Sequence, residues 1–250
     1  DICHVEPNVG GIIVQAHFIP ENLTKGIELM QQNKCAMDII TELVQSDNMA
    51  IDRQYGIVTL QGGIGCFFGT ELMSNGTFEN STLQPGVQCT AFSGNNLPYW
   101  QGHIVGNNYS IQGNILAGEE IVRDMETAFL ETEGALPIKL MAALHAAKRI
   151  GADSRCDSTS SLCACIKVAR PNDSIDNLLL DINVTNVKGD PIDSLQTEFD
   201  RIYSPSGKSL HKDAPAEFEL LRNYPNPFNP QTTICYDLTQ SCDTIKTAKS

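Results

Sequence analysis

The sequence has little positive charge, very little tryptophan and no long apolar run, and each lack excludes a class of protein. Lysine and arginine number 17 against 30 acidic residues, which gives a formal charge of −13. Such a surface repels phosphate groups, so we expect no nucleic-acid partner. No apolar stretch approaches the roughly 20 residues of a membrane-spanning helix, so we expect no membrane insertion. Trp100 is the single tryptophan, and a large aromatic platform for sugars is therefore not evident.

Metal-ligand patterns are also absent from the sequence. No pair of cysteines has the CxxC spacing, and no cysteine stands at zinc-finger distance from histidines. The acidic residues between positions 173 and 193 do not match a calcium-binding loop. We therefore predict no metal and no cofactor.

The cysteines are numerous, at nine, and an odd count leaves at least one without a partner in the chain. Cys66 and Cys89 lie on two apolar runs that flank a polar excursion, which makes them a candidate disulfide. The alternative is that both are small residues of the core. Cys163 and Cys165 are two apart in an expected strand, so they share a face and are not expected to bond each other.

Apolar residues make up 41% of the chain, and their spacing predicts strands and helices in alternating groups. The expected strands are residues 11–16, 55–60, 64–68, 87–92, 162–169 and 178–182. The expected helices are residues 25–32, 35–46, 119–130 and 136–149, and residues 72–86 are expected to form a surface loop. Helix pairs between groups of antiparallel strands favour an α+β fold with a four-layer αββα sandwich, while a three-layer domain is the alternative.

The C-terminal fifth of the sequence has a different composition. Residues 204–219 are rich in Pro, Ser, Gly and Lys, which is typical of a linker. The prolines that follow favour an extended entry into a strand at 233–238. We therefore predict a domain at 1–203, a linker at 204–219 and an extended C-terminal tail, a small β segment, at 220–250.

One long motif resembles a known family. Residues 108–118 read Asn-Tyr-Ser-Ile-Gln-Gly-Asn-Ile-Leu-Ala-Gly, and Arg53-Gln-Tyr-Gly lies upstream of them. From about Val9 to Ile202 the chain resembles the bacterial domain-of-unknown-function 1028 family of Ntn-hydrolase-like proteins. The resemblance implies the αββα sandwich and an N-terminal residue as nucleophile. Relatives begin with a further strand, so we expect the chain from Asp1 onward to lack the strand that would carry it.

A second motif lies in the tail. Residues 224–234 read Tyr-Pro-Asn-Pro-Phe-Asn-Pro-Gln-Thr-Thr-Ile and are similar to the start of the C-terminal sorting domain of type IX secretion cargo. The similarity implies export and an extracellular or outer cell-surface location on a bacterium.

Four residues are weak candidates for catalysis. Gln112 and Asn114 flank a glycine and could bind a substrate carbonyl, although turn chemistry explains them equally well. Asp153 and Arg155 could orient a ligand, although an ion pair at a helix exit is the simpler explanation. Arg53 is expected to be a structural ion-pair partner.

The sequence leaves open whether the chain is an enzyme, and it supports three functional hypotheses. The first is a structural protein that self-assembles, as a homo-oligomer or filament, by strand exchange. The residues expected to carry this exchange are Thr233, Ile234, Cys235, Tyr236 and Leu238. The alternative is an amide-bond hydrolase with a small amide or peptide ligand, whose nucleophile lies outside this sequence. A carbohydrate- or peptide-binding module is the third.

Overall fold

The computed structural model describes residues 2–62, 69–73, 76–80, 86–203, 218–224 and 233–238. The chain divides into two compact units, Asp1–Arg201 and Ile202–Ser250. The first unit combines helices with antiparallel strands, which confirms the predicted α+β class. None of the described helices is long and apolar enough to cross a membrane.

A six-stranded sheet, called the first sheet below, is built from the N-terminal half of the chain. Its strands follow the order β1-β2-β3-β6-β5-β4, and each neighbouring pair is antiparallel. The strands are β1 (Cys3–Glu6), β2 (Gly10–Gln15), β3 (Gln54–Gly62), β4 (Gly69–Met73), β5 (Gly76–Asn80) and β6 (Gly86–Gly94). Because β3 pairs with both β2 and β6, its first residues lie in the middle of the sheet.

Two helices cover the outer face of the first sheet, α1 (Pro20–Gln31) and α2 (Ala36–Ser46). The first begins at Pro20, earlier than the predicted start, because proline is well suited to the first turn of a helix. Both helices turn an apolar face to the sheet, as the helical period predicts. The packed residues include Ile12, Ile27, Met30, Ile39, Ile40, Leu43, Tyr55, Ile57 and Phe92. A short 3-10 helix, η1 (Ala50–Asp52), leads into β3.

The region between β3 and β6 differs from its predicted form. The surface loop expected at residues 72–86 is wrong in part, because β5 runs through Gly76–Asn80 and pairs with β4 and β6. Short strands near the edge of an antiparallel sheet can be largely polar, so they lack the apolar alternation by which a strand is predicted. The strand expected at residues 64–68 lies outside the described residues.

A second group of strands comes from the C-terminal part of the first unit. It contains the hairpin of β7 (Trp100–Gly106) and β8 (Tyr109–Leu116), and the antiparallel pair β9 (Cys163–Val168) and β10 (Leu180–Thr185). Three helices accompany these strands, α3 (Glu120–Glu131), α4 (Leu136–Ala147) and α5 (Pro191–Ile202).

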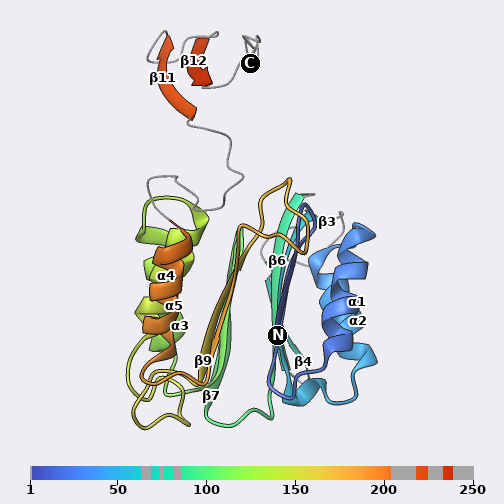
Figure 1. The fold of residues 1–250 in the computed structure, drawn as a ribbon. Coiled ribbons are helices and arrows are strands. Elements are labelled where there is room, and N and C mark those ends of the chain that lie inside the picture. Colours follow the sequence, from blue (N-terminus) through green and yellow to red (C-terminus); the bar gives the residue numbers. More distant parts are fainter. Residues whose placement is uncertain are drawn as a thin grey trace. The chain divides into compact units, whose positions relative to one another are not determined.

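The helices of the first unit lie on its outside. In Figure 1, α1 and α2 lie beside β3 and β6, while α3, α4 and α5 lie on the opposite side, beside β7 and β9. The strands of both groups therefore lie between two groups of helices, and β3 and β6 contact β8 across the interior.

The second unit contains an antiparallel pair, β11 (Phe218–Tyr224) and β12 (Thr233–Leu238). The five residues expected to carry strand exchange all lie in β12, which pairs with β11 of the same chain. Of the predicted linker, residues 204–217 lie outside the described residues, as do residues 225–232 and 239–250 of the predicted β segment.

Candidate catalytic site

A buried amide joins the first sheet to the β7–β8 hairpin. Gln54, the first residue of β3, has no solvent exposure. Its Nε2 atom lies 2.7 Å from Ser93 Oγ, 2.9 Å from the Gly102 carbonyl oxygen and 3.0 Å from the Gly113 carbonyl oxygen. Its Oε1 atom accepts a hydrogen bond of 3.1 Å from Asn114 Nδ2. An amide nitrogen carries only two hydrogens, so the three acceptors share them. This network holds four strands together.

The same network contains a serine beside a histidine. Ser93 lies opposite Gln54 in the β3–β6 register, and His103 lies on β7. Ser93 Oγ is 2.8 Å from His103 Nδ1, and His103 Nε2 is 3.9 Å from Glu79 Oε2 on β5. The hydroxyl of Ser93 can donate to Nδ1 when the imidazole carries its proton on Nε2, the nitrogen nearer the carboxylate. A hydroxyl, an imidazole and a carboxylate therefore stand in series, with the two ring nitrogens in the opposite roles to those of the Ser-His-Asp triad.

The electrostatics of the series follow from burial. The His103 side chain is only 6% exposed, and burial lowers the pKa of its imidazole to about 4. Burial also raises the pKa of Glu79, and the charge of Glu126 adds to this, although a hydrogen bond with the Val105 backbone opposes both. At neutral pH the imidazole is uncharged, so it can accept the proton of Ser93.

Tyr109 and a second carboxylate, Glu126, lie near Glu79. The Tyr109 hydroxyl donates a hydrogen bond of 2.6 Å to Glu126 Oε1 on α3. Burial and this contact raise the pKa of Tyr109 to about 12, and the charge of Glu79 also contributes. The hydroxyl therefore stays protonated and remains a donor throughout the neutral range.

A second amide lies on β8 opposite the histidine. Gln112 pairs with His103 in the β7–β8 register, and its Nε2 atom is 3.3 Å from Gln15 Oε1. Its Oε1 atom is buried and has no hydrogen-bond partner among the described residues. A Cβ atom on Gly56 would lie 2.1 Å from that oxygen, so a larger residue there would displace the Gln112 amide from this position. A buried acceptor without a donor is costly, which suggests that a ligand group supplies one.

The sequence candidates for catalysis fall into two places. Asn114 belongs to the buried network through Gln54, and Gln112 lies beside it with a hydrogen bond to Gln15. Both lie within β8 and not in the predicted turn, because the glycine between them pairs with Gly102 of β7. Asp153 and Arg155 lie in the segment that follows α4, where they contact each other. Arg155 Nε donates to Asp153 Oδ1 at 2.8 Å, and this pair takes no part in the network.

Sequence reasoning missed Ser93, His103 and Glu79. These residues lie on three strands, and their contacts arise from strand register rather than from spacing along the chain.

A separate polar cluster lies on the other side of β3. Asp47 Oδ2 accepts hydrogen bonds from Arg53 Nε at 2.5 Å, from the Tyr55 hydroxyl at 2.6 Å and from Asn22 Nδ2 at 3.2 Å. Burial alone would raise the pKa of Asp47, but the bonds from Tyr55 and Arg53 lower it overall. Arg53 is therefore the structural ion-pair partner that the sequence predicted.

The acidic, histidine and cysteine residues of the described ranges are scattered. Within the described ranges, no cluster of three or more His, Cys, Asp or Glu residues could hold a metal ion. Cys89 is buried in β6, but Cys66 lies outside the described residues, so their pairing stays a prediction.

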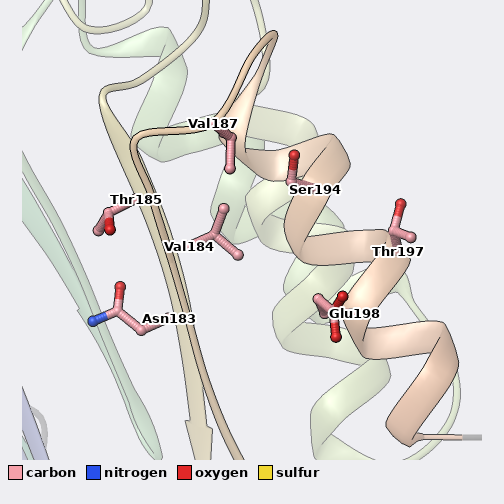
Figure 2. A pocket seen from close by; sticks show the side chains of 7 residues that line it. All are labelled: Asn183, Val184, Thr185, Val187, Ser194, Thr197 and Glu198. Carbon is pink, nitrogen blue, oxygen red and sulfur yellow. The ribbon is translucent and has the colours of Figure 1, made fainter.

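A surface groove of about 410 Å³ lies between β10 and α5 (Figure 2). It is lined by Asn183, Val184, Thr185, Val187, Ser194, Thr197 and Glu198. None of these residues belongs to the buried network, so the groove is separate from the candidate site.

The first unit is thus an α+β protein whose strand groups meet around a buried polar network. The profile of a family of unknown function, DUF1028, matches residues 1–85 and 81–195, and the chain therefore belongs to that family. The crystal structure of protein SPO2555 from Silicibacter pomeroyi, described by the same family name, matches with a TM-score of 0.61 and 15% sequence identity. That match covers 81% of this chain and 76% of the other, and it shows the fold alone. No curated protein matches the chain.

Proposed function

We propose that the first unit is a hydrolase of amide or ester bonds, built on an Ntn-hydrolase-like αββα sandwich. The observation that carries the proposal is the contact of 2.8 Å between Ser93 Oγ and His103 Nδ1, with Glu79 beyond the other ring nitrogen. The positions of the helices outside the two strand groups support the sandwich. This nucleophile differs from the N-terminal residue that the family resemblance implies.

In the proposed reaction, His103 takes the proton of Ser93 as Oγ attacks a substrate carbonyl carbon. The imidazolium that forms is costly in so buried a place, and the negative charge of Glu79 stabilises it. His103 then returns the proton to the leaving group, and water hydrolyses the acyl-serine in the reverse sequence of steps.

The amides of Gln112 and Asn114 supply the polar surroundings of the carbonyl. Both lie on the face of β8 that carries the cross-strand partner of His103, and Asn114 Nδ2 already donates to Gln54 Oε1. Amide N–H groups that point toward a developing oxyanion lower the barrier to its formation. The buried Gln112 Oε1, in turn, can accept a hydrogen bond from a substrate amide N–H.

The decisive experiment combines covalent labelling with turnover. We expect a fluorophosphonate probe to label Ser93, and we expect Ser93→Ala to abolish labelling and to lower kcat by about a thousandfold or more on any ester or amide that the protein hydrolyses. Ser110→Ala is the matched control, because the Ser110 hydroxyl is buried on β8 and has no hydrogen-bond partner within the described ranges. Absence of labelling and of turnover with folded protein, or unchanged activity in Ser93→Ala, would contradict the proposal.

The second candidate function is self-assembly of an exported protein at the cell surface. It is supported by the sorting-domain similarity of residues 224–234 and by the pairing of β12 with a single neighbour among the described residues. A two-stranded sheet has edges that can accept a further strand. We expect the full chain to form homo-oligomers, and deletion of residues 204–250 to prevent them. A chain that stays monomeric by light scattering at high concentration would contradict this function.

A further inference from the structure

Two cysteines that are far apart in the sequence of the first unit lie side by side. Cys3 is in β1, at the edge of the first sheet, and Cys165 is in β9 of the second strand group. Their Sγ atoms are 4.0 Å apart, although 162 positions separate the two residues in the chain. Both side chains are partly exposed, so a small reagent can reach them. The pair therefore stands where the two strand groups meet.

The alternation of β9 explains why Cys165 faces β1. Ala164, Ile166 and Val168 are buried, so the other set of side chains points to the opposite face of the strand. That set contains Cys165, together with Cys163, which is exposed. A third member is Lys167, whose charge acts on Cys3.

The surroundings make the two thiols unequal. The contact with the Cys165 thiol lowers the pKa of Cys3 to about 7, burial opposes this, and the charge of Lys167 adds to the lowering. The contact with Cys3 and burial raise the pKa of Cys165. At neutral pH a substantial fraction of Cys3 is therefore thiolate, the nucleophile of disulfide exchange, while Cys165 stays a thiol.

We propose that Cys3 and Cys165 form a disulfide that fastens β1 to β9 and so locks the two strand groups together at this edge. The oxidant is an external disulfide, such as glutathione disulfide or a disulfide oxidoreductase. Cys3 Sγ attacks one sulfur of that disulfide, which releases one thiolate and leaves a mixed disulfide on Cys3. Cys165 then loses its proton and attacks Cys3 Sγ, which releases the second thiol. Two protein thiols are oxidised and one external disulfide is reduced to two thiols.

The geometry requires only a small movement. A disulfide bond is roughly 2 Å long, so the two sulfur atoms must approach by about 2 Å, which side-chain rotation can supply. Among the described residues, Cys35 is already disulfide-bonded, and an environment that keeps that bond would also favour this one. Because the new link closes a very long loop, it restricts the unfolded chain strongly.

The test uses the full chain, equilibrated with glutathione and glutathione disulfide and then alkylated. Peptide mapping without reduction is expected to recover Cys3 and Cys165 in one cross-linked peptide pair. Under the oxidising condition, the thermal midpoint of the wild-type chain is expected to exceed that of Cys3→Ser and of Cys165→Ser by about 5–15 °C.

The matched control is Cys163→Ser, which changes a cysteine on the same face of β9, two residues from Cys165. We expect it to keep both the cross-linked peptides and the wild-type midpoint. Recovery of alkylated Cys3 and Cys165 after oxidation would overturn the proposal, and so would a link between Cys3 and Cys163. The mapping is done on the wild-type chain, so it decides the question even if a serine variant folds poorly.

Discussion

Acidification should weaken the fold through a single histidine. The ordinary pKa of histidine is about 6.5, and burial lowers that of His103 to about 4. Between these two values the unfolded chain binds a proton that the folded chain does not, so the free energy of unfolding falls as the pH falls. Each pH unit in this interval costs about 1.4 kcal/mol, so the full loss is about 3 kcal/mol. Above pH 6.5 this proton does not affect the free energy of unfolding, and by pH 4 the full loss has occurred.

Urea unfolding of the wild-type chain and of His103→Gln, measured from pH 7.5 to 4, tests this expectation. Carboxylates also titrate at the acidic end, so the quantity of interest is the difference between the two chains at each pH. The stability of His103→Gln should depend less on pH, by about 3 kcal/mol over the interval.

His145→Gln is the control, because His145 is an exposed histidine whose Nε2 lies 2.7 Å from Gln196 Oε1. It should follow the wild-type pH dependence. The reasoning would be refuted if His103→Gln kept the wild-type slope, or if the His103 ring titrated near 6.5 by NMR.

Two further substitutions test the packing of the first unit. Asp47→Asn should lower the free energy of unfolding at pH 7 by about 3–5 kcal/mol, because it removes one charge of an ion pair whose carboxylate is 4% exposed, whereas Glu119→Gln in an exposed pair should cost less than about 1 kcal/mol. Gly94→Ala should cost about 1–3 kcal/mol or more, because its Cβ would lie 2.3 Å from the Ile51 carbonyl oxygen, while Gly11→Ala meets only ordinary contacts. Denaturant unfolding checks both pairs, and equal costs within a pair would contradict the packing argument.

The pH dependence of the stability of Asp47→Asn checks independently that the pKa of Asp47 is lowered in the folded chain. Because its hydrogen bonds lower the pKa of Asp47, the stabilisation is complete above the ordinary value of about 3.9 and is lost as the pH falls through the lower folded value. The difference between wild type and Asp47→Asn should therefore shrink in strong acid.

Several elements with a clear apolar period were predicted from the sequence, although α5 (Pro191–Ile202), whose buried Ile192, Leu195 and Phe199 have helical spacing, was not. The helix expected at 119–130 occurs at Glu120–Glu131, and the strand expected at 162–169 occurs at Cys163–Val168. In each, side chains buried at regular spacing must be apolar, and the sequence records that need directly. Strand β7 (Trp100–Gly106) was missed, because none of its residues is fully buried and two are glycines.

The candidate site was less predictable, for a physical reason. Its hydrogen bonds connect strands whose neighbours are set by the whole sheet, such as Gln54 with Gly113, which are 59 positions apart. Gln112 and Asn114 could be singled out because they flank Gly113 in a recognisable motif. The residues around Ser93 and His103 in the sequence form no such motif. Polar residues that become buried only when two strand groups meet produce no regular pattern of apolar residues in the sequence of either group.

The order in which the strand groups occur along the chain has a consequence for synthesis on the ribosome. The first sheet and the helices that cover it are complete by Gly94, and among the described residues their apolar core is formed from positions between Val9 and Phe92. That half can therefore condense before β7 is translated. Until then Gln54 and Ser93 remain hydrated, and they exchange water for Gly102, Gly113 and His103 only when the hairpin docks. The polar network therefore forms late in folding. A hairpin that docks in the wrong register is disfavoured, because it leaves buried donors without acceptors.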